Sequence, residues 1–330
     1  MKFQYPSKIK LANLPTPIKK MEKYSQTIDG PEIYIKRDDL TGITLTGNKV
    51  RKLEFVVAEA LEQNADVLIT CGGIQSNHAR ATAVVAAQSG INSFLVLRGQ
   101  QTADIDGNLF LDHLMGADVK FITAEDYRDH VDEIMEEAAE NLRQQGYRPY
   151  IIPEGASNEL GAVGYIAATE EIVSQLKAMN LKIDTIISAT GSGGTYAGLL
   201  MGKRIFNQNY EVYGINVCDD EQYFINRISE ILKKAQNRFK LNLNLSRADI
   251  KIIDGYVGEG YALCRPQEIE TIKKVAQTEA IVLDPVYTGK AMLGLTDQIK
   301  KGRFIKGEKI LFLHSGGIFG LFAYRGLFGK

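Results

Sequence analysis

The residue of this chain best suited to covalent chemistry is Lys49, because of where the sequence pattern places it. Residues 33–35 are typical of a strand, residues 38–47 of a polar loop, and the apolar residues from Val50 to Leu61 follow helical spacing. Lys49 is therefore predicted at a helix start, where free N–H groups and the helix dipole favour anions. A lysine held there has a lowered pKa, and its neutral amine can attack an aldehyde to form a Schiff base. The alternative is a solvated surface lysine.

Two glycine-rich turns offer sites for anions. Residues 71–78 and residues 189–195 each follow a predicted strand and lead into a helix. Each turn places free N–H groups at the carboxyl end of a strand, where an anion can approach the backbone. By position, the first turn could hold a substrate carboxylate and the second a phosphate, although either could be a plain chain reversal. An NAD site is disfavoured, because no acidic residue stands about 20 residues beyond the second turn in the expected context.

Two C-terminal segments, residues 283–292 and 312–317, also follow predicted strands and open into helices. Tyr287 in the first of them is either a core aromatic with a satisfied hydroxyl or, in company with Lys49 and Ser76, a proton-transfer group. The strands that precede these segments have to bring them together for any shared chemistry.

The elements that position these residues are short apolar runs that alternate with helical patterns. This alternation predicts an α/β protein whose parallel sheets are covered by helices on both faces. There are too many strands for one comfortable sheet, so two sheets are expected. The expected strands are 33–35, 67–70, 94–97, 119–122, 150–152, 185–188, 213–217, 281–283 and 310–313.

Composition narrows the class of protein and its ligands. The chain has 330 residues, long enough for two domains, and 39 Lys and Arg residues against 40 Asp and Glu residues give a net charge of -1. This balance gives no case for nucleic acid or an anionic membrane, so a small ligand is the expected partner. The three cysteines show no zinc or disulfide spacing, and no metal site is expected. With no apolar leader or membrane span in the sequence, a soluble cytoplasmic protein is expected.

Four motifs in their order along the chain resemble the D-cysteine desulfhydrase and 1-aminocyclopropane-1-carboxylate deaminase family. These enzymes use pyridoxal 5'-phosphate and have fold type II, the tryptophan-synthase-β type. The resemblance spans most of the chain and also implies a homodimer. It is carried by residues 46–54, 73–78, 190–195 and 284–290.

The resemblance implies a role for each matching residue. Lys49 matches the lysine that binds the cofactor aldehyde and then serves as a base for the α-proton. Ser76, with the N–H groups of Asn77 and His78, would receive the substrate carboxylate, and Tyr287 and Tyr261 would flank the substrate. The residues expected to hold the cofactor are Lys49, Lys52, Asn77 at the phenolic oxygen, the phosphate turn Thr190, Gly191, Ser192, Gly193, Gly194 and Thr195, and Thr288.

Position 288 bears on the choice of substrate. The family's deaminases carry Glu after the tyrosine, where this chain carries Thr288. A cofactor ring nitrogen that faces a hydroxyl stays neutral and stabilises a carbanion less than one that faces a carboxylate. Expelling a thiolate needs less help than opening a cyclopropane ring, so we expect conversion of D-cysteine to pyruvate, ammonia and hydrogen sulfide.

Other activities stay open at this point. The first alternative is 1-aminocyclopropane-1-carboxylate deaminase, which gives 2-oxobutyrate and ammonia, and eliminases of sulfonate or hydroxy amino acids are further ones. A protein of another class would bind an amino acid on the same fold without catalysis. Because Lys49 and the 191–195 turn must converge on one cofactor, a smaller domain at 48–160 is expected within a larger one formed by 1–47 plus 161–330.

Overall fold

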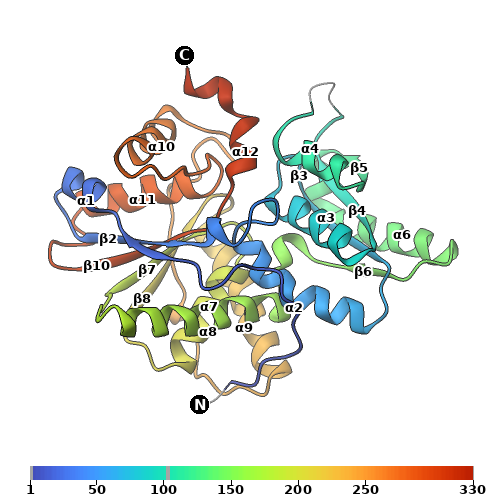
Figure 1. Ribbon diagram of the computed structural model, residues 1–330, viewed down its shortest axis with the longest axis horizontal. Coiled ribbons are helices and arrows are strands. Elements are labelled where there is room, and N and C mark those ends of the chain that lie inside the picture. The colour runs from blue at the N-terminus through green and yellow to red at the C-terminus, as the bar shows by residue number, and fades with distance from the viewer. Residues whose placement is uncertain (1–2, 102–104, 330) are drawn as a thin grey trace.

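The computed structural model describes residues 3–101 and 105–329, which form two sheets surrounded by helices (Figure 1). The strands are β1 Ile18–Lys20, β2 Glu32–Arg37, β3 Val67–Gly73, β4 Asn92–Arg98, β5 Asp118–Ile122, β6 Pro149–Ile151, β7 Thr185–Thr190, β8 Glu211–Asn216, β9 Lys251–Ile253 and β10 Lys309–His314. Six strands form the larger sheet in the order β1-β2-β10-β7-β8-β9, and four form the smaller in the order β5-β4-β3-β6. All neighbours are parallel except β1 and β2. The expected fold class is confirmed.

Helices cover both faces of the larger sheet. The α-helices of the described residues are α1 Glu22–Ile28, α2 Asn48–Glu62, α3 Asn77–Ser89, α4 Gly107–Leu114, α5 Ala124–Asp129, α6 Val131–Gln144, α7 Glu159–Ala178, α8 Gly194–Ile205, α9 Glu221–Arg238, α10 Pro266–Glu279, α11 Thr288–Lys300 and α12 Ile318–Phe322. In Figure 1, α1, α10 and α11 lie on one side of the larger sheet and α7, α8 and α9 on the other. The smaller sheet lies among α3, α4 and α6.

The central strands are buried on both faces, because apolar residues occupy consecutive positions along them. Leu311 and Ile186 belong to the core cluster that includes residues of α2, α7, α8 and α9. Phe312 and Ile187, one position further along the same strands, belong to the cluster that includes residues of α10 and α11. Successive side chains of a strand point to opposite faces, so continuous apolar runs are the sequence of a doubly covered parallel sheet.

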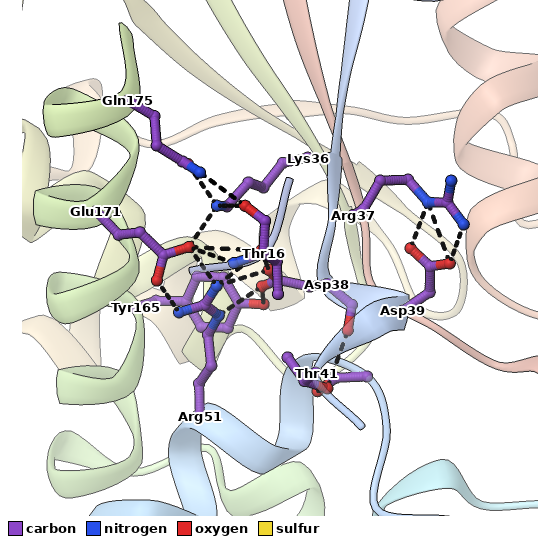
Figure 2. Close-up of polar contacts among 11 residues, drawn as sticks. Thr16, Lys36, Arg37, Asp38, Asp39, Thr41, Arg51, Tyr165, Glu171 and Gln175 are labelled. Carbon is purple, nitrogen blue, oxygen red and sulfur yellow. Dashed lines mark hydrogen bonds and ion pairs between the residues drawn. The ribbon is translucent and has the colours of Figure 1, made fainter. Parts of the chain in front are cut away.

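Helix α2 is fixed against α7 and the larger sheet by a buried network of charges (Figure 2). Arg51 donates to both carboxylate oxygens of Asp38 at 2.8 Å and to both of Glu171 at 3.0 Å. Tyr165 donates to Asp38 at 2.6 Å, and Lys36 pairs with Glu171. Two cations thus face two carboxylates, and the charges balance within the fold.

The structure corrects one expected strand and adds two. Residues 281–283 form no strand: the carbonyl of Val282 lies 3.0 Å from Nε2 of His314, and the Ile281 and Leu283 side chains are buried in the core. Burial rather than strand pairing therefore explains this apolar run. The strands β1 and β9, of three residues each, lie at the two edges of the larger sheet and were not expected.

The four strands of the smaller sheet lie between residues 67 and 151, inside the segment 48–160. The domain boundaries themselves stay a prediction, because one core cluster contains residues of both parts, including Leu68 and Ile186. Among the described residues, no helix combines the length and apolar character needed to cross a membrane.

Candidate active site

A cleft of about 710 Å³ is lined by residues from both sheets. It lies where strands β3, β4, β7 and β10 end and where α2, α3 and α8 begin, as expected for a ligand site of a parallel sheet. Of the expected site residues, the cleft is lined by Lys49, Ser76, Asn77, His78, Thr190, Gly191, Ser192, Gly193, Thr195, Tyr261 and Tyr287.

Lys49 is the second residue of α2, so its expected position at a helix start is confirmed. Gly47 precedes the helix with φ 94°, and the N–H of Asn48 donates to the carbonyl of Ser315 at 3.0 Å. Any other residue at position 47 would be strained by that φ, and its Cβ would lie 2.7 Å from the Ser315 oxygen. The helix start is thereby tied to the end of β10.

Burial in the cleft lowers the pKa of Lys49 to about 8, although the carboxylates of Glu154 and Asp284 act in the opposite direction. Burial, rather than the helix dipole, is the main cause. Its Nζ lies 3.1 Å from the side-chain oxygen of Asn48 and 5.8 Å from the ring centre of Tyr287. An amine with this pKa is partly neutral near pH 8 and can act as a nucleophile or a base.

Ser76 caps the start of α3, and its Oγ accepts the N–H groups of His78 at 3.2 Å and Ala79 at 3.1 Å. The N–H of His78 thus has a protein acceptor, and its expected role as a donor to the substrate carboxylate stays a prediction. Within residues 3–101 and 105–329, the N–H groups of Gln75 and Asn77 donate to no protein acceptor. Asn77 and Ser76 line the cleft, so the Asn77 N–H and the Ser76 hydroxyl remain available there to an anion.

The side chains of Asn77 and His78 are each oriented by one partner. Oδ1 of Asn77 accepts from Asn108 at 3.1 Å, which leaves its amide N–H₂ free to donate in the cleft. Nε2 of His78 lies 2.8 Å from the hydroxyl of Thr70, and burial lowers the pKa of His78 well below its usual value. His78 is thus a neutral, buried residue beside the cleft.

The turn after β7 forms a cradle of N–H and hydroxyl groups. Gly193, with φ 84°, precedes α8, and the N–H of Gly194 donates to Ser157 Oγ at 3.2 Å. Ser157 Oγ also lies 2.7 Å from Ser192 Oγ, and Thr195 Oγ1 accepts from Asn48 at 3.0 Å. The turn is therefore linked to α2 and to the loop after β6.

Lys52 places a buried cation beside this turn. Its Nζ donates to the carbonyl of Gly155 at 3.0 Å and to Ser157 Oγ at 2.9 Å, and it would lie 2.8 Å from a Cβ at Gly194. Burial lowers the pKa of Lys52 well below its usual value, and the charge of Lys49 lowers it further. It has no carboxylate partner among the described residues. A cation in this state is stabilised by an anionic ligand, and a phosphate suits both the cation and the turn.

Tyr261 and Tyr287 form a hydrogen-bonded pair in the cleft, with 2.5 Å between their hydroxyl oxygens. Tyr287 precedes α11 and its N–H donates to Asp284, while Tyr261 lies in the loop after β9. Burial raises the pKa of both hydroxyl groups, so both stay protonated at neutral pH. The structure thus brings together two proton donors that are 26 residues apart in the sequence.

Thr288 is not brought to the cleft with the others. It is fully buried, and its hydroxyl donates to Asp284 Oδ1 at 2.6 Å and accepts the N–H of Asp284 at 2.8 Å. Ser315, which follows β10, does line the cleft. The hydroxyl residue that lines the cleft from this side is therefore Ser315, and its position after a strand and before two glycines was the signal available in the sequence.

Three further lining residues were not expected from the sequence. Arg98 ends β4, Tyr127 belongs to α5, and Glu154 begins the short helix after β6, Glu154–Ala156. The hydroxyl of Tyr127 donates to Glu154 at 2.8 Å. All three come from the part of the chain that holds the smaller sheet.

These groups fit the cofactor that the resemblance implied. The amine of Lys49, with its lowered pKa, suits the cofactor aldehyde. The glycine turn beside Lys52 suits the phosphate, and the amide of Asn77 suits the phenolic oxygen. The turn is also closely packed: a Cβ at Gly191 would lie 3.0 Å from the Tyr287 ring.

Comparison with known proteins agrees with this chemistry. The family described as "Pyridoxal-phosphate dependent enzyme" matches residues 9–316. The chain is 44% identical over 321 residues to the bifunctional D-cysteine desulfhydrase/1-aminocyclopropane-1-carboxylate deaminase, mitochondrial, of Arabidopsis thaliana, covering 94% of this chain and 78% of that one. It is 39% identical to the D-cysteine desulfhydrase of Klebsiella pneumoniae, covering 96% of both. A crystal structure of an ACC deaminase homologue superposes with a TM-score of 0.90 at 38% identity, covering 98% of this chain and 95% of the other.

Proposed function

Because the chain belongs to the pyridoxal-phosphate dependent enzymes, we propose that it catalyses β-elimination from a small D-amino acid, with D-cysteine as substrate. The products are pyruvate, ammonia and hydrogen sulfide, with one water consumed. The observation that carries the proposal is that the amine of Lys49 and the Tyr261–Tyr287 pair face the same cleft. The Lys49 amine suits removal of a proton, and the tyrosine pair suits donation of a proton.

When bound, the cofactor withdraws electrons from the substrate α-carbon and so makes its proton acidic. Lys49, Lys52, Asn77 and the 190–195 turn would hold it. With a pKa of about 8, Lys49 Nζ accepts the α-proton as a neutral amine and returns a proton later in the cycle.

The substrate is oriented by its carboxylate. The Ser76 hydroxyl and the N–H of Asn77 bind this carboxylate at the start of α3, where the helix dipole favours negative charge. The Tyr261 and Tyr287 hydroxyls then face the rest of the substrate, and the pair donates a proton to the departing sulfur. Protonation of the leaving group completes the elimination without release of a free thiolate.

A second candidate is 1-aminocyclopropane-1-carboxylate deaminase. It is favoured by the names of the bifunctional Arabidopsis relative and of the superposed deaminase homologue. Because Thr288 faces Asp284 rather than the cleft, the identity of residue 288 does not by itself separate the two activities.

A product assay separates these activities. The purified protein is given D-cysteine, L-cysteine and 1-aminocyclopropane-1-carboxylate in parallel, and sulfide, pyruvate and 2-oxobutyrate are measured. Sulfide and pyruvate from D-cysteine at the highest rate support the proposal. Faster 2-oxobutyrate formation replaces it with the deaminase. An amino acid that shifts the cofactor absorbance without any product indicates a non-catalytic binding protein.

We also propose a homodimer and a cytoplasmic location. The resemblance supports the first, and the composition the second, whereas the Arabidopsis relative is named as mitochondrial. Light scattering of the purified protein and fractionation of source cells test these two proposals directly.

A further inference from the structure

Arg98 is a cation in the cleft that the proposed chemistry has not used. It ends β4, so it belongs to the smaller sheet, and it lies in register with Gly73 at the end of β3. No carboxylate pairs with it among residues 3–101 and 105–329. A half-buried arginine without an acidic partner needs another source of stabilisation.

Two aromatic rings provide that stabilisation. The guanidinium carbon of Arg98 lies 4.7 Å from the ring centre of Tyr261 and 5.1 Å from that of Tyr127. Both distances are within the range of cation–π attraction, and a planar guanidinium stacks on rings better than an ammonium does. Tyr127 is itself fixed, because its hydroxyl donates to Glu154 at 2.8 Å.

The contact joins two parts of the molecule. Arg98 and Tyr127 come from the chain around the smaller sheet, whereas Tyr261 comes from a loop after β9, the edge strand of the larger sheet. The Tyr261 ring also lies 3.3 Å from the position of a Cβ at Gly73, so a larger residue there would disturb it. Tyr261 is thus held from the smaller sheet by Arg98 and bonded on the other side to Tyr287.

We propose that Arg98 is a positioning residue that holds the Tyr261 ring across the cleft and so sets the proton-transfer geometry of the Tyr261–Tyr287 pair. The proposal rests on the proposed elimination, in which that pair protonates the leaving group. Displacement of a proton donor by a small distance reduces a rate strongly while leaving substrate affinity nearly unchanged.

The charge of Arg98 adds a second effect on Tyr261. The titratable and charged groups that face its hydroxyl are Tyr287, Glu154, Cys218 and Arg98. Burial is the main cause of its raised pKa, the Tyr287 hydroxyl and Arg98 lower it, and Glu154 and Cys218 raise it. Removal of the guanidinium should therefore make the Tyr261 hydroxyl a weaker acid.

The test compares Arg98→Met, which keeps the length without the charge, with Arg98→Lys, which keeps the charge without the planar stack. Lys274→Met is the matched control, because Lys274 lies 5.7 Å from the Tyr24 ring centre, and neither residue lines the cleft. Each variant is prepared as holoenzyme, with kcat and KM measured on the substrate that the product assay identifies. Each is also prepared with 3-fluorotyrosine in place of Tyr261, and the chemical shift of its fluorine NMR signal is measured without substrate at neutral pH.

Arg98→Met should lower kcat about tenfold with KM within about twofold, and should shift the fluorine signal of residue 261, because the cation 4.7 Å from the ring centre is lost. Arg98→Lys should recover part of both changes, and Lys274→Met should show neither. A raised KM at unchanged kcat would overturn the proposal in favour of direct substrate contact, and an unshifted fluorine signal would overturn the link to Tyr261. A shifted signal in a protein that turns over no substrate would reject the proposed function but support the Arg98–Tyr261 contact.

Discussion

Helix α2 carries buried basic residues on two sides, and their pKa values shift in opposite directions. Arg51 lies in the network of Figure 2, where Asp38 and Glu171 accept from its guanidinium and hold its pKa above the usual value despite burial. Lys49 and Lys52, on the same helix, have lowered pKa values, because burial outweighs the nearby carboxylates Glu154 and Asp284 at Lys49 and because Lys52 has no carboxylate partner among the described residues. The network completes its own charge balance and fixes the helix. The lysines do not, and their charges are available to a ligand.

The difference separates residues that build the site from residues that use it. A buried ion pair with all its hydrogen bonds is costly to break but contributes no chemistry. An uncompensated buried cation costs stability, and functional sites retain such groups because a ligand or a reaction requires them. Substitutions on the two sides of α2 should therefore affect different measurements.

The largest effect is expected for Lys49→Ala. Removing the amine takes away both the covalent attachment of the cofactor and the base for the α-proton, so activity should fall at least about a hundredfold. After borohydride treatment, mass spectrometry should find the cofactor on Lys49 in the wild-type protein and on no lysine in the variant. Lys120→Ala, at an exposed position, is the control. Cofactor fixed to another lysine of the wild-type protein would show that the assignment is wrong.

The second largest effect is expected on stability, for a substitution of Arg51 on the other side of α2. Arg51→Met leaves Asp38 without its cationic partner and Glu171 with Lys36 alone, which should lower the free energy of unfolding by about 3–5 kcal/mol. Lys20→Met breaks an exposed pair with Glu32 and should change it by less than about 1 kcal/mol. Denaturant titration of the apoproteins measures both. Equal effects of the two substitutions would contradict the distinction between the two sides.

Lys52→Met should separate stability from ligand binding. The affinity for pyridoxal phosphate should fall about tenfold to a hundredfold, because a charge-assisted contact to the phosphate is lost. The apoprotein should be as stable as wild type or more stable, since a buried amine that has no carboxylate partner among the described residues is removed. Equilibrium dialysis and denaturant titration give the two quantities. A variant that loses stability as Arg51→Met does, with unchanged affinity, would place Lys52 among the structural charges.

Much of this site could be predicted from the sequence, because its parts are local. Lys49, Ser76 and the 190–195 turn each stand in a short segment whose strand, glycine turn and helix are visible in the residue pattern. Continuous apolar runs likewise predict the covered strands of both sheets. The edge strands β1 and β9 have only three residues each, too few to show a period.

The residues that were missed depend on contacts between distant segments. Arg98 and Glu154 follow predicted strands, but nothing local indicates that they face Tyr261 or Tyr127. Thr288 shows the converse error: it is adjacent to Tyr287, yet the first turn of α11 directs its hydroxyl to Asp284 rather than to the cleft. Sequence neighbours at a helix start point in different directions, and only the assembled fold decides which one meets the ligand.

The smallest predicted effect is in the pH dependence of Lys49. Its pKa is lowered to about 8, so the neutral, reactive amine becomes more populated as the pH rises through that value. Between pH 7 and pH 9 the neutral fraction should rise from roughly a tenth to roughly nine tenths, and the rate of cofactor capture by the apoprotein should rise about ninefold and then level off. Stopped-flow absorbance measures this rate, with free Nα-acetyllysine as the reference for an unburied amine, which should still be gaining about tenfold per pH unit at pH 9. A capture rate that rises with the same steepness as the reference, without a plateau, would mean that Lys49 behaves as an exposed lysine. The proposed difference in pKa shift between Lys49 and Arg51 on the two sides of α2 would then be wrong.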